Sequence, residues 1–167
     1  MAFRLQSFFE LEAEITNPLD LTTVSAPLAM ARQLILAQGT GAGQADMIWS
    51  DQFTISASGT QAVDLAGTLQ GPFGTTLTFA RIKMVIVAAA LGNTNNVNVV
   101  SDATNGPLLF LAKGDGIPVK PGGMFVSFDP SAAGTVITPS TADLINLVNS
   151  AGGTTVTCDV VVVGASA

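Results

Sequence analysis

The chain contains no histidine and no tyrosine, and has one cysteine and one tryptophan among its 167 residues. Histidine is the most frequent general base and the usual partner of serine and cysteine nucleophiles. One cysteine without histidine cannot build the nitrogen and sulfur shell of a zinc site, and the lone Cys158 excludes an internal disulfide. A carboxylate pair, as glycosidases use, stays open, but no spacing points to one. We therefore predict a protein that is not an enzyme, with no metal and no cofactor.

Charged side chains are scarce as well. They make up 11% of the chain, against about 25% in a typical soluble domain, while 48% of the residues are hydrophobic. Twelve acids and six scattered bases give a net charge of -6, which lacks the basic patch that nucleic acid requires. A surface this poor in charge, with a mean hydropathy of +0.51, indicates either a membrane protein or a protein covered by other subunits.

Long hydrophobic runs are missing too. A membrane-spanning helix needs about 20 consecutive apolar residues, whereas the longest apolar stretches, residues 84–91 and 160–163, are the size of strands. The N-terminus has neither the continuous apolar segment nor the cleavage site of a signal peptide. We therefore expect no contact with a membrane, and a surface that meets other protein subunits.

What the sequence does contain is alternation of apolar and polar residues, which is typical of half-buried strands. Near the N-terminus, Glu10, Glu12 and Glu14 separate four apolar residues, Phe9, Leu11, Ala13 and Ile15. We expect a strand with one apolar and one acidic face. Calcium binds six to eight converging oxygens, and a flat row of carboxylates does not converge. The acidic face is therefore interpreted as solvated, or as a surface that meets basic residues of a partner.

Residues 25–38 fit either a helical stripe or a strand. We interpret them as a loop followed by a strand at 32–36, which would form a hairpin with a strand at 47–57. Gly39, Gly41 and Gly43 lie between the two. Their spacing resembles a phosphate-binding loop, but such a loop is followed by a helix. Because a strand pattern follows here, we predict a hairpin turn.

The longest apolar region, residues 75–90, predicts a central strand. We expect Arg81 and Lys83 to point outward, and the apolar residues that alternate with them to point inward: Leu77, Phe79, Ile82, Met84, Ile86 and Ala88. Further strands are expected at intervals of about ten residues, a spacing typical of sandwiches and barrels. They lie at 108–111, 117–119, 124–128, 136–138, 142–149 and 156–162. The last strand should bury one face, formed by Val156, Cys158, Val160 and Val162.

Together these patterns predict an all-β protein of nine or ten strands without a long amphipathic helix. We expect one antiparallel β-sandwich of jelly-roll type with an extended N-terminal arm. The arm and first strand would occupy residues 1–35, and the β-sandwich domain residues 36–167.

Several segments of this sandwich resemble small virion structural proteins of tailed double-stranded DNA bacteriophages. The likeness begins near Leu36 and is clearest in the turns. It is carried by residues 39–51 (GTGAGQADMIWSD), 63–67, 79–83, 119–124 (VKPGGM), 142–149 and 157–164. The resemblance implies a decoration, or cement, subunit on the capsid exterior that is made in the host cytoplasm. Its partners would be the major capsid protein and further copies of itself, as a dimer or trimer, without nucleic acid, membrane or small-molecule substrate.

The N-terminal segment carries the candidate interface residues. Phe3, Leu5, Phe8 and Phe9 give it more apolar area than an exposed tail should have. We consider two interpretations, an arm that interlocks with a neighbouring subunit and a first strand of the sandwich itself. Two other functions remain open, a tail or fibre subunit and a carbohydrate-binding module that uses Trp49.

Overall fold

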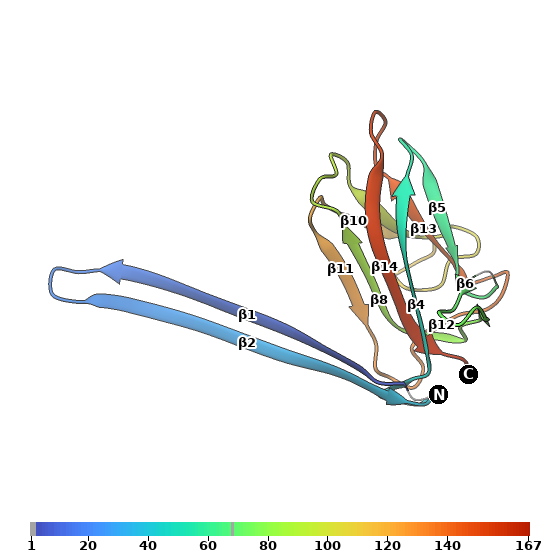
Figure 1. Ribbon diagram of the computed structural model, residues 1–167, viewed down its shortest axis with the longest axis horizontal. Helices are drawn as coiled ribbons and strands as arrows, with labels where there is room; N and C mark the ends of the chain where they lie inside the picture. The colour runs from blue at the N-terminus through green and yellow to red at the C-terminus, as the bar shows by residue number, and fades with distance from the viewer. Residues whose placement is uncertain (1–2, 68) are drawn as a thin grey trace.

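The computed structural model describes residues 3–67 and 69–167, and strands are the regular elements of these residues. Figure 1 shows a β-sandwich and a long two-stranded hairpin that projects away from it. The predicted all-β class and the antiparallel sandwich are confirmed. Met1 and Ala2, which belong to the predicted arm, lie outside the described residues.

The sandwich consists of two sheets whose neighbouring strands all run antiparallel. The first sheet has the order β11 (Met124–Phe128), β8 (Arg81–Ala89), β14 (Val156–Ala165) and β4 (Met47–Ile55), and β12 (Thr135–Val136) also pairs with β8. The second has the order β10 (Gly116–Val119), β9 (Val97–Ser101), β13 (Leu144–Asn149) and β5 (Thr60–Asp64). A small separate hairpin is formed by β6 (Leu69–Gln70) and β7 (Thr76–Leu77).

The core lies between the two sheets and is built from alternate residues of each strand. The predicted inward face of the last strand is confirmed, because its four residues Val156, Cys158, Val160 and Val162 all lie in this core. From the opposite sheet, Val97, Val99 and Leu147 are fully buried against them. Strands whose side chains alternate in this way bury one face and leave the other for a second contact.

Strand β8 is central, as predicted, but its faces are not the expected ones. Met84 pairs with Val163 and Ile82 pairs with Gly164, so Lys83 is an extra residue that shifts the register. A bulge of this kind changes which side chains point to which face. Ile82, Val85 and Val87 therefore enter the core, whereas Met84 and Ile86, predicted to point inward, lie on the outer face.

Lys83 is the second correction on this strand. It was predicted to point outward, but it is 1% exposed. Its ammonium group donates hydrogen bonds to the carbonyl oxygens of Ser131 and Ala132. Burial lowers the pKa of Lys83, partly offset by the negative charge of Asp129. Carbonyl groups of the neighbouring loop thus replace the water that an exposed lysine would bind.

The strand predicted at residues 108–111 is wrong. These residues belong to the loop between β9 and β10, and Leu111 is 98% exposed. Turn chemistry determines this segment: the Asp102 carboxylate accepts hydrogen bonds from the backbone N–H groups of Thr104 and Asn105, and Asp115 accepts one from Ala112. Aspartate side chains that bond nearby backbone groups favour turns over strand pairing.

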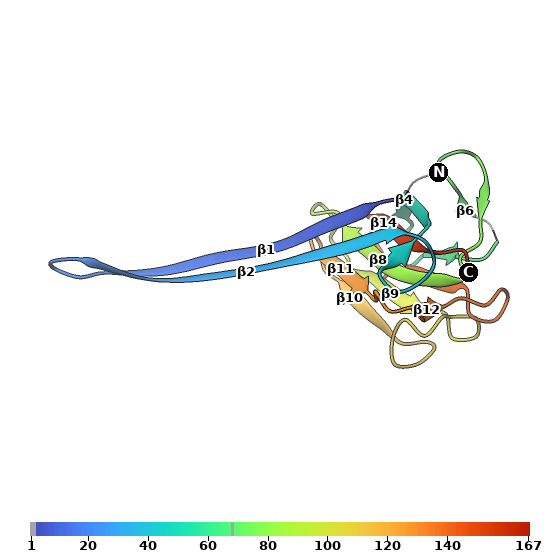
Figure 2. The ribbon, with the colours of Figure 1, turned by 90° about the horizontal axis from the view of Figure 1, so that it is seen from below.

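The projecting hairpin consists of β1 (Leu5–Pro18) and β2 (Thr23–Gln38), paired from Leu5↔Leu36 to Pro18↔Thr23. The predicted hairpin between residues 32–36 and 47–57 is therefore wrong. β2 runs instead alongside β3 (Gln44–Ala45) in parallel, so the turn at 39–43 is not a hairpin turn. We call residues 5–38 the arm. Figure 2 shows it extending well beyond one side of the sandwich.

Candidate functional site: an amphipathic arm

The arm is attached to the sandwich by a small apolar cluster at its base. Leu36 and Ala45 are buried on the outer face of the first sheet, against Met84 and Val163. Partly buried residues complete what we call the base cluster, namely Phe3, Leu5, Ile86, Phe128 and Val161. The backbone N–H of Gly43 also donates to the carbonyl oxygen of Pro130 at 2.7 Å. These contacts hold the base of the arm on the sandwich.

Glycine at position 39 is required by the turn that follows the arm. Its φ of 139° is rarely adopted by other residues, and a Cβ there would collide with the side chain of Gln44. That side chain accepts a hydrogen bond from the N–H of Gly41 at 2.9 Å. Gly39 and the hydrogen bond of Gly41 thus shape the link between the parallel strands β2 and β3, which is not the predicted hairpin turn.

Beyond its base the arm projects away from the sandwich (Figures 1 and 2). Every residue from 8 to 33 is exposed. The chain has an accessible surface area of 9160 Å², whereas a compact monomer of its mass, 16.9 kDa, exposes about 7,700 Å². The excess, roughly 1,500 Å², is larger than the approximately 800 Å² that one partner contributes to a standard protein–protein interface.

One face of the arm is mainly apolar, interrupted by Ser7, Asn17 and Arg32. The register places Leu11 opposite Met30 and Ala13 opposite Leu28, so these side chains share one face. Phe9, Ile15, Val24 and Ala26 belong to the same face. The large side chains here are between 38% exposed (Met30) and 77% exposed (Ile15). An apolar strip of this extent is characteristic of a surface that binds another protein.

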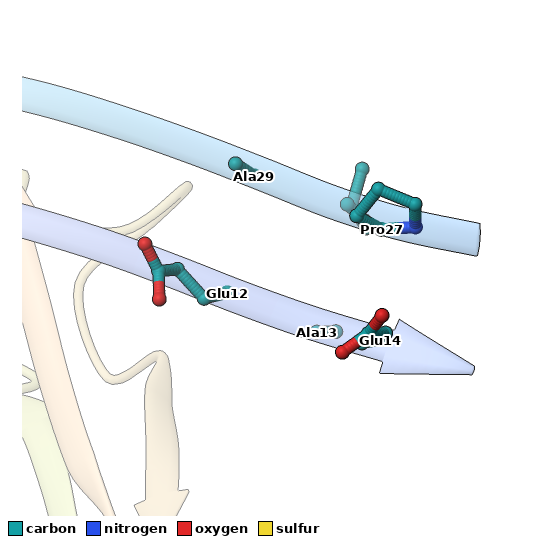
Figure 3. A pocket seen from close by; sticks show the side chains of 6 residues that line it. Glu12, Ala13, Glu14, Pro27 and Ala29 are labelled. Carbon is teal, nitrogen blue, oxygen red and sulfur yellow. The ribbon is translucent and has the colours of Figure 1, made fainter. Parts of the chain in front are cut away.

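The opposite face is acidic. Glu10, Glu12 and Glu14 stand across from Ala31, Ala29 and Pro27, which are uncharged. Figure 3 shows Glu12 and Glu14 projecting from β1, beside strand β2 with Pro27 and Ala29. The two strands border an open depression without enclosing walls, lined by Glu12, Ala13, Glu14, Pro27, Leu28 and Ala29. The described residues contain no group of three or more histidine, cysteine or acidic side chains placed to hold a metal ion.

The four predicted interface residues separate into two groups. Phe3 and Leu5 pack in the base cluster and anchor the arm. Phe8 and Phe9 are 67% and 53% exposed and point to opposite faces of β1. The structure does not bring the four together. The segment forms neither a loose tail nor a strand of the sandwich, because β1 pairs with β2 outside both sheets.

The interpretation of residues 25–38 missed the second half of the apolar face. The predicted loop before residue 32 contains Leu28 and Met30, which the structure places on the apolar face of β2. The second strand lacks apolar–polar alternation over residues 26–31 (APLAMA). The turn at 19–22, where the N–H of Leu19 donates to the carbonyl oxygen of Thr22 at 2.7 Å, contains no glycine, so the usual sequence signal for a hairpin is missing.

Two single residues of the sandwich offer no alternative site. Trp49 is 6% exposed, and the centroids of its ring and the Phe53 ring are 6.1 Å apart. The Trp49 ring is therefore not presented to a sugar. Cys158 is buried, and burial raises the pKa of its thiol to about 11. A thiol with a raised pKa forms little of the nucleophilic thiolate.

The described residues contain no helix long and apolar enough to cross a membrane. No protein-family model matches the chain, and neither curated proteins nor solved structures give a significant match.

Proposed function

We propose that the chain is a non-enzymatic structural subunit of a bacteriophage virion, a capsid decoration or cement protein. It binds the outside of the capsid and stabilises the lattice of the major capsid protein. Before assembly the subunit resides in the host cytoplasm. The observation that carries the proposal is the arm, whose residues 8–33 are all exposed and which has an apolar face. The resemblance to virion structural proteins supplies the kind of assembly.

The mechanism is mass action. A subunit that binds the assembled lattice and not its free components stabilises the lattice by its binding free energy. Repetition of the contact over the shell multiplies the effect. The sequence suits this role in two ways. Its few charged residues leave surface for contacts with other subunits, and the absence of histidine suits a subunit without catalysis.

We also infer a jelly-roll topology. In this fold an antiparallel ribbon is rolled into two sheets, so strands from the two halves of the chain lie side by side. The strand order supports it: β4 neighbours β14, β5 neighbours β13, and β9 neighbours β10. The remaining pair, β8 and β11, follows the same rule.

The test uses capsids assembled without the subunit and a variant with a shortened arm. Residues 11–30 are replaced by Asn-Gly, which joins the cross-strand partners Glu10 and Ala31 through a tight hairpin turn. We expect the full chain to raise the temperature at which capsids rupture. The shortened chain should fold but leave rupture unchanged.

A matched control replaces Glu12 and Ala29, a cross-strand pair on the acidic face, with threonine and keeps the arm at full length. If saturating wild-type protein leaves the rupture temperature of the capsids unchanged, the cement role is wrong. Immunogold labelling of intact particles separates a head position from a tail or fibre position, and label on the tail alone would likewise reject the proposal.

A further inference from the structure

We propose that the apolar face of the arm binds the same face of a second copy, with the two arms antiparallel about a two-fold axis. The pair forms a small four-stranded sandwich between two larger ones. This inference concerns the purified chain before assembly; because the proposed function uses the same face of the arm, the dimer dissociates when the arm binds the capsid.

The first argument is that the arm requires a cover. A two-stranded hairpin alone is marginally stable in water, and hairpins become stable when a third strand or another layer covers their apolar side. At the base, Leu5 and Leu36 obtain that cover from the base cluster. The same face continues outward through Leu11, Met30 and Leu28, which are 41%, 38% and 58% exposed. The uncovered part is thus the continuation of a face that is already in contact with a sheet.

The second argument is size. The uncovered part of β1, residues 8–18, spans about 36 Å at roughly 3.3 Å per residue, and two strands are about 10 Å wide. Two such faces in contact cover about 700 Å² in flat projection, and side-chain relief raises the buried area toward the lower range of specific interfaces, about 1,200 Å². A second arm is a partner of matching length and shape.

The third argument is charge. Arg32 is the charged residue of the apolar face, opposite Phe9 near the base, whereas Asp20 lies in the turn at the tip. In an antiparallel pair centred on Ala13, position 9 of one arm faces position 17 of the other. Each Arg32 then faces Val24 of the partner and lies about three residues, roughly 10 Å along the strands, from the partner's Asp20, which provides the opposite charge. The two rows of glutamates face outward, on opposite sides of the pair.

A two-fold arrangement is also the simplest closed one. It uses the same surface on both copies, and dimers of this type are the commonest soluble oligomers. Sheets packed face to face lie about 10 Å apart with their strands nearly aligned. The small side chain of Ala13, opposite Leu28 at the middle of the arm, then lies close to the axis.

The test compares two matched cross-strand pairs by sedimentation and light scattering. The wild-type chain is expected to form a dimer of twice 16.9 kDa that dissociates on dilution. Replacing Leu11 and Met30 with threonine keeps strand propensity and should weaken the dimer at least about tenfold. The pair Glu12 and Ala29, replaced in the same way, should leave the dimer within about twofold of wild type, because these residues lie on the outer face.

A cross-linking measurement fixes the arrangement. Ala13→Cys should be joined to its partner by a bismaleimide that spans about 10 Å, whereas Ala29→Cys, on the opposite face, should not. Cys158 gives no background because it is buried. Arg32→Asp and Asp20→Arg should each weaken the dimer, and their combination should restore it.

A wild-type chain that stays monomeric up to sub-millimolar concentration overturns the inference. So does a dimer that is indifferent to the Leu11 and Met30 replacements, or one that lacks the cross-link at Ala13. A monomer that still binds capsids through its arm would reject this inference and leave the proposed function standing.

Discussion

The sandwich and the arm are built from the same kind of strand but cover their apolar faces in different ways. In the sandwich each apolar face packs on the other sheet, so that Val162 and Leu147 are fully buried. In the arm the same alternation leaves Leu28 58% exposed and Ile15 77% exposed. Alternation therefore shows that a strand has an apolar face, and only the tertiary structure shows whether the chain itself covers it.

The largest difference should appear when phenylalanine is truncated in each part. Phe79 is 1% exposed, whereas Phe8 is 67% exposed. Phe79→Ala should lower the free energy of unfolding by about 3–5 kcal/mol because it leaves a cavity. Phe8→Ala should change it by less than about 0.5 kcal/mol. Urea denaturation measures both, and equal effects would contradict the division into core and uncovered arm.

The junction between the two parts should show a smaller effect. Leu36→Ala removes a fully buried side chain from the base cluster. The substitution should lower the free energy of opening the base of the arm by about 2 kcal/mol. Because Arg32 is exposed in the arm, trypsin cleavage at this residue reports how often the arm opens. Since 1.4 kcal/mol corresponds to a factor of ten in an equilibrium constant, a loss of about 2 kcal/mol should make cleavage of the Leu36→Ala variant about thirtyfold faster.

The neighbouring Ile35→Ala is the matched control for that experiment. Ile35 is 50% exposed and points to the opposite face of the same strand. Its truncation should leave the cleavage rate nearly unchanged. Equal acceleration in both variants would mean that the base cluster does not hold the arm.

The pH dependence of stability should arise in the sandwich and its loops. Backbone N–H groups of Asn105 and Thr104, followed by the side chain of Asn146, hold the pKa of Asp102 below its usual value of 3.8. A carboxyl whose pKa is lowered by folding stabilises the protein above the unfolded pKa, and this stabilisation is lost as the pH falls through the folded pKa. Asp102→Asn should flatten the decline in stability below about pH 4, measured by thermal unfolding. An unchanged decline would assign it to other carboxyls.

The smallest expected effect concerns the thiol in the core. Cys158 is 1% exposed and its pKa is raised to about 11, so Ellman's reagent should react with it at the rate of unfolding. By contrast, Ala13→Cys should react at once when it is combined with the threonine replacements of Leu11 and Met30, which keep the chain monomeric. A fast reaction of the wild-type thiol would show that the sandwich opens locally at β14.

The fold class followed from the sequence because alternation is a local signal. Val156 to Val162 identified the face of β14 that enters the core, and the central position of β8 followed from its apolar length. Lys83 escaped prediction because a bulge changes faces without changing the pattern, and because its carbonyl partners come from a distant loop.

The candidate site was only partly predictable. The acidic row and the exposed Phe8 and Phe9 are visible in the sequence, but the pairing of β2 with β1 was missed. Ala29 and Ala31 favour helix over strand, and Pro27 argues against a central strand. A proline is tolerated here because β1–β2 is a two-stranded ribbon outside both sheets of the sandwich.

The most direct test of the division between core and contact element is hydrogen exchange, measured on the dilute chain and on its assembled form. On assembly the amides of residues 8–33 should exchange at least about tenfold more slowly, while those of β8, β13 and β14 should keep their rates. Unchanged exchange in the arm, together with slower exchange confined to the sandwich, would contradict the assignment of the arm as the element that binds other subunits.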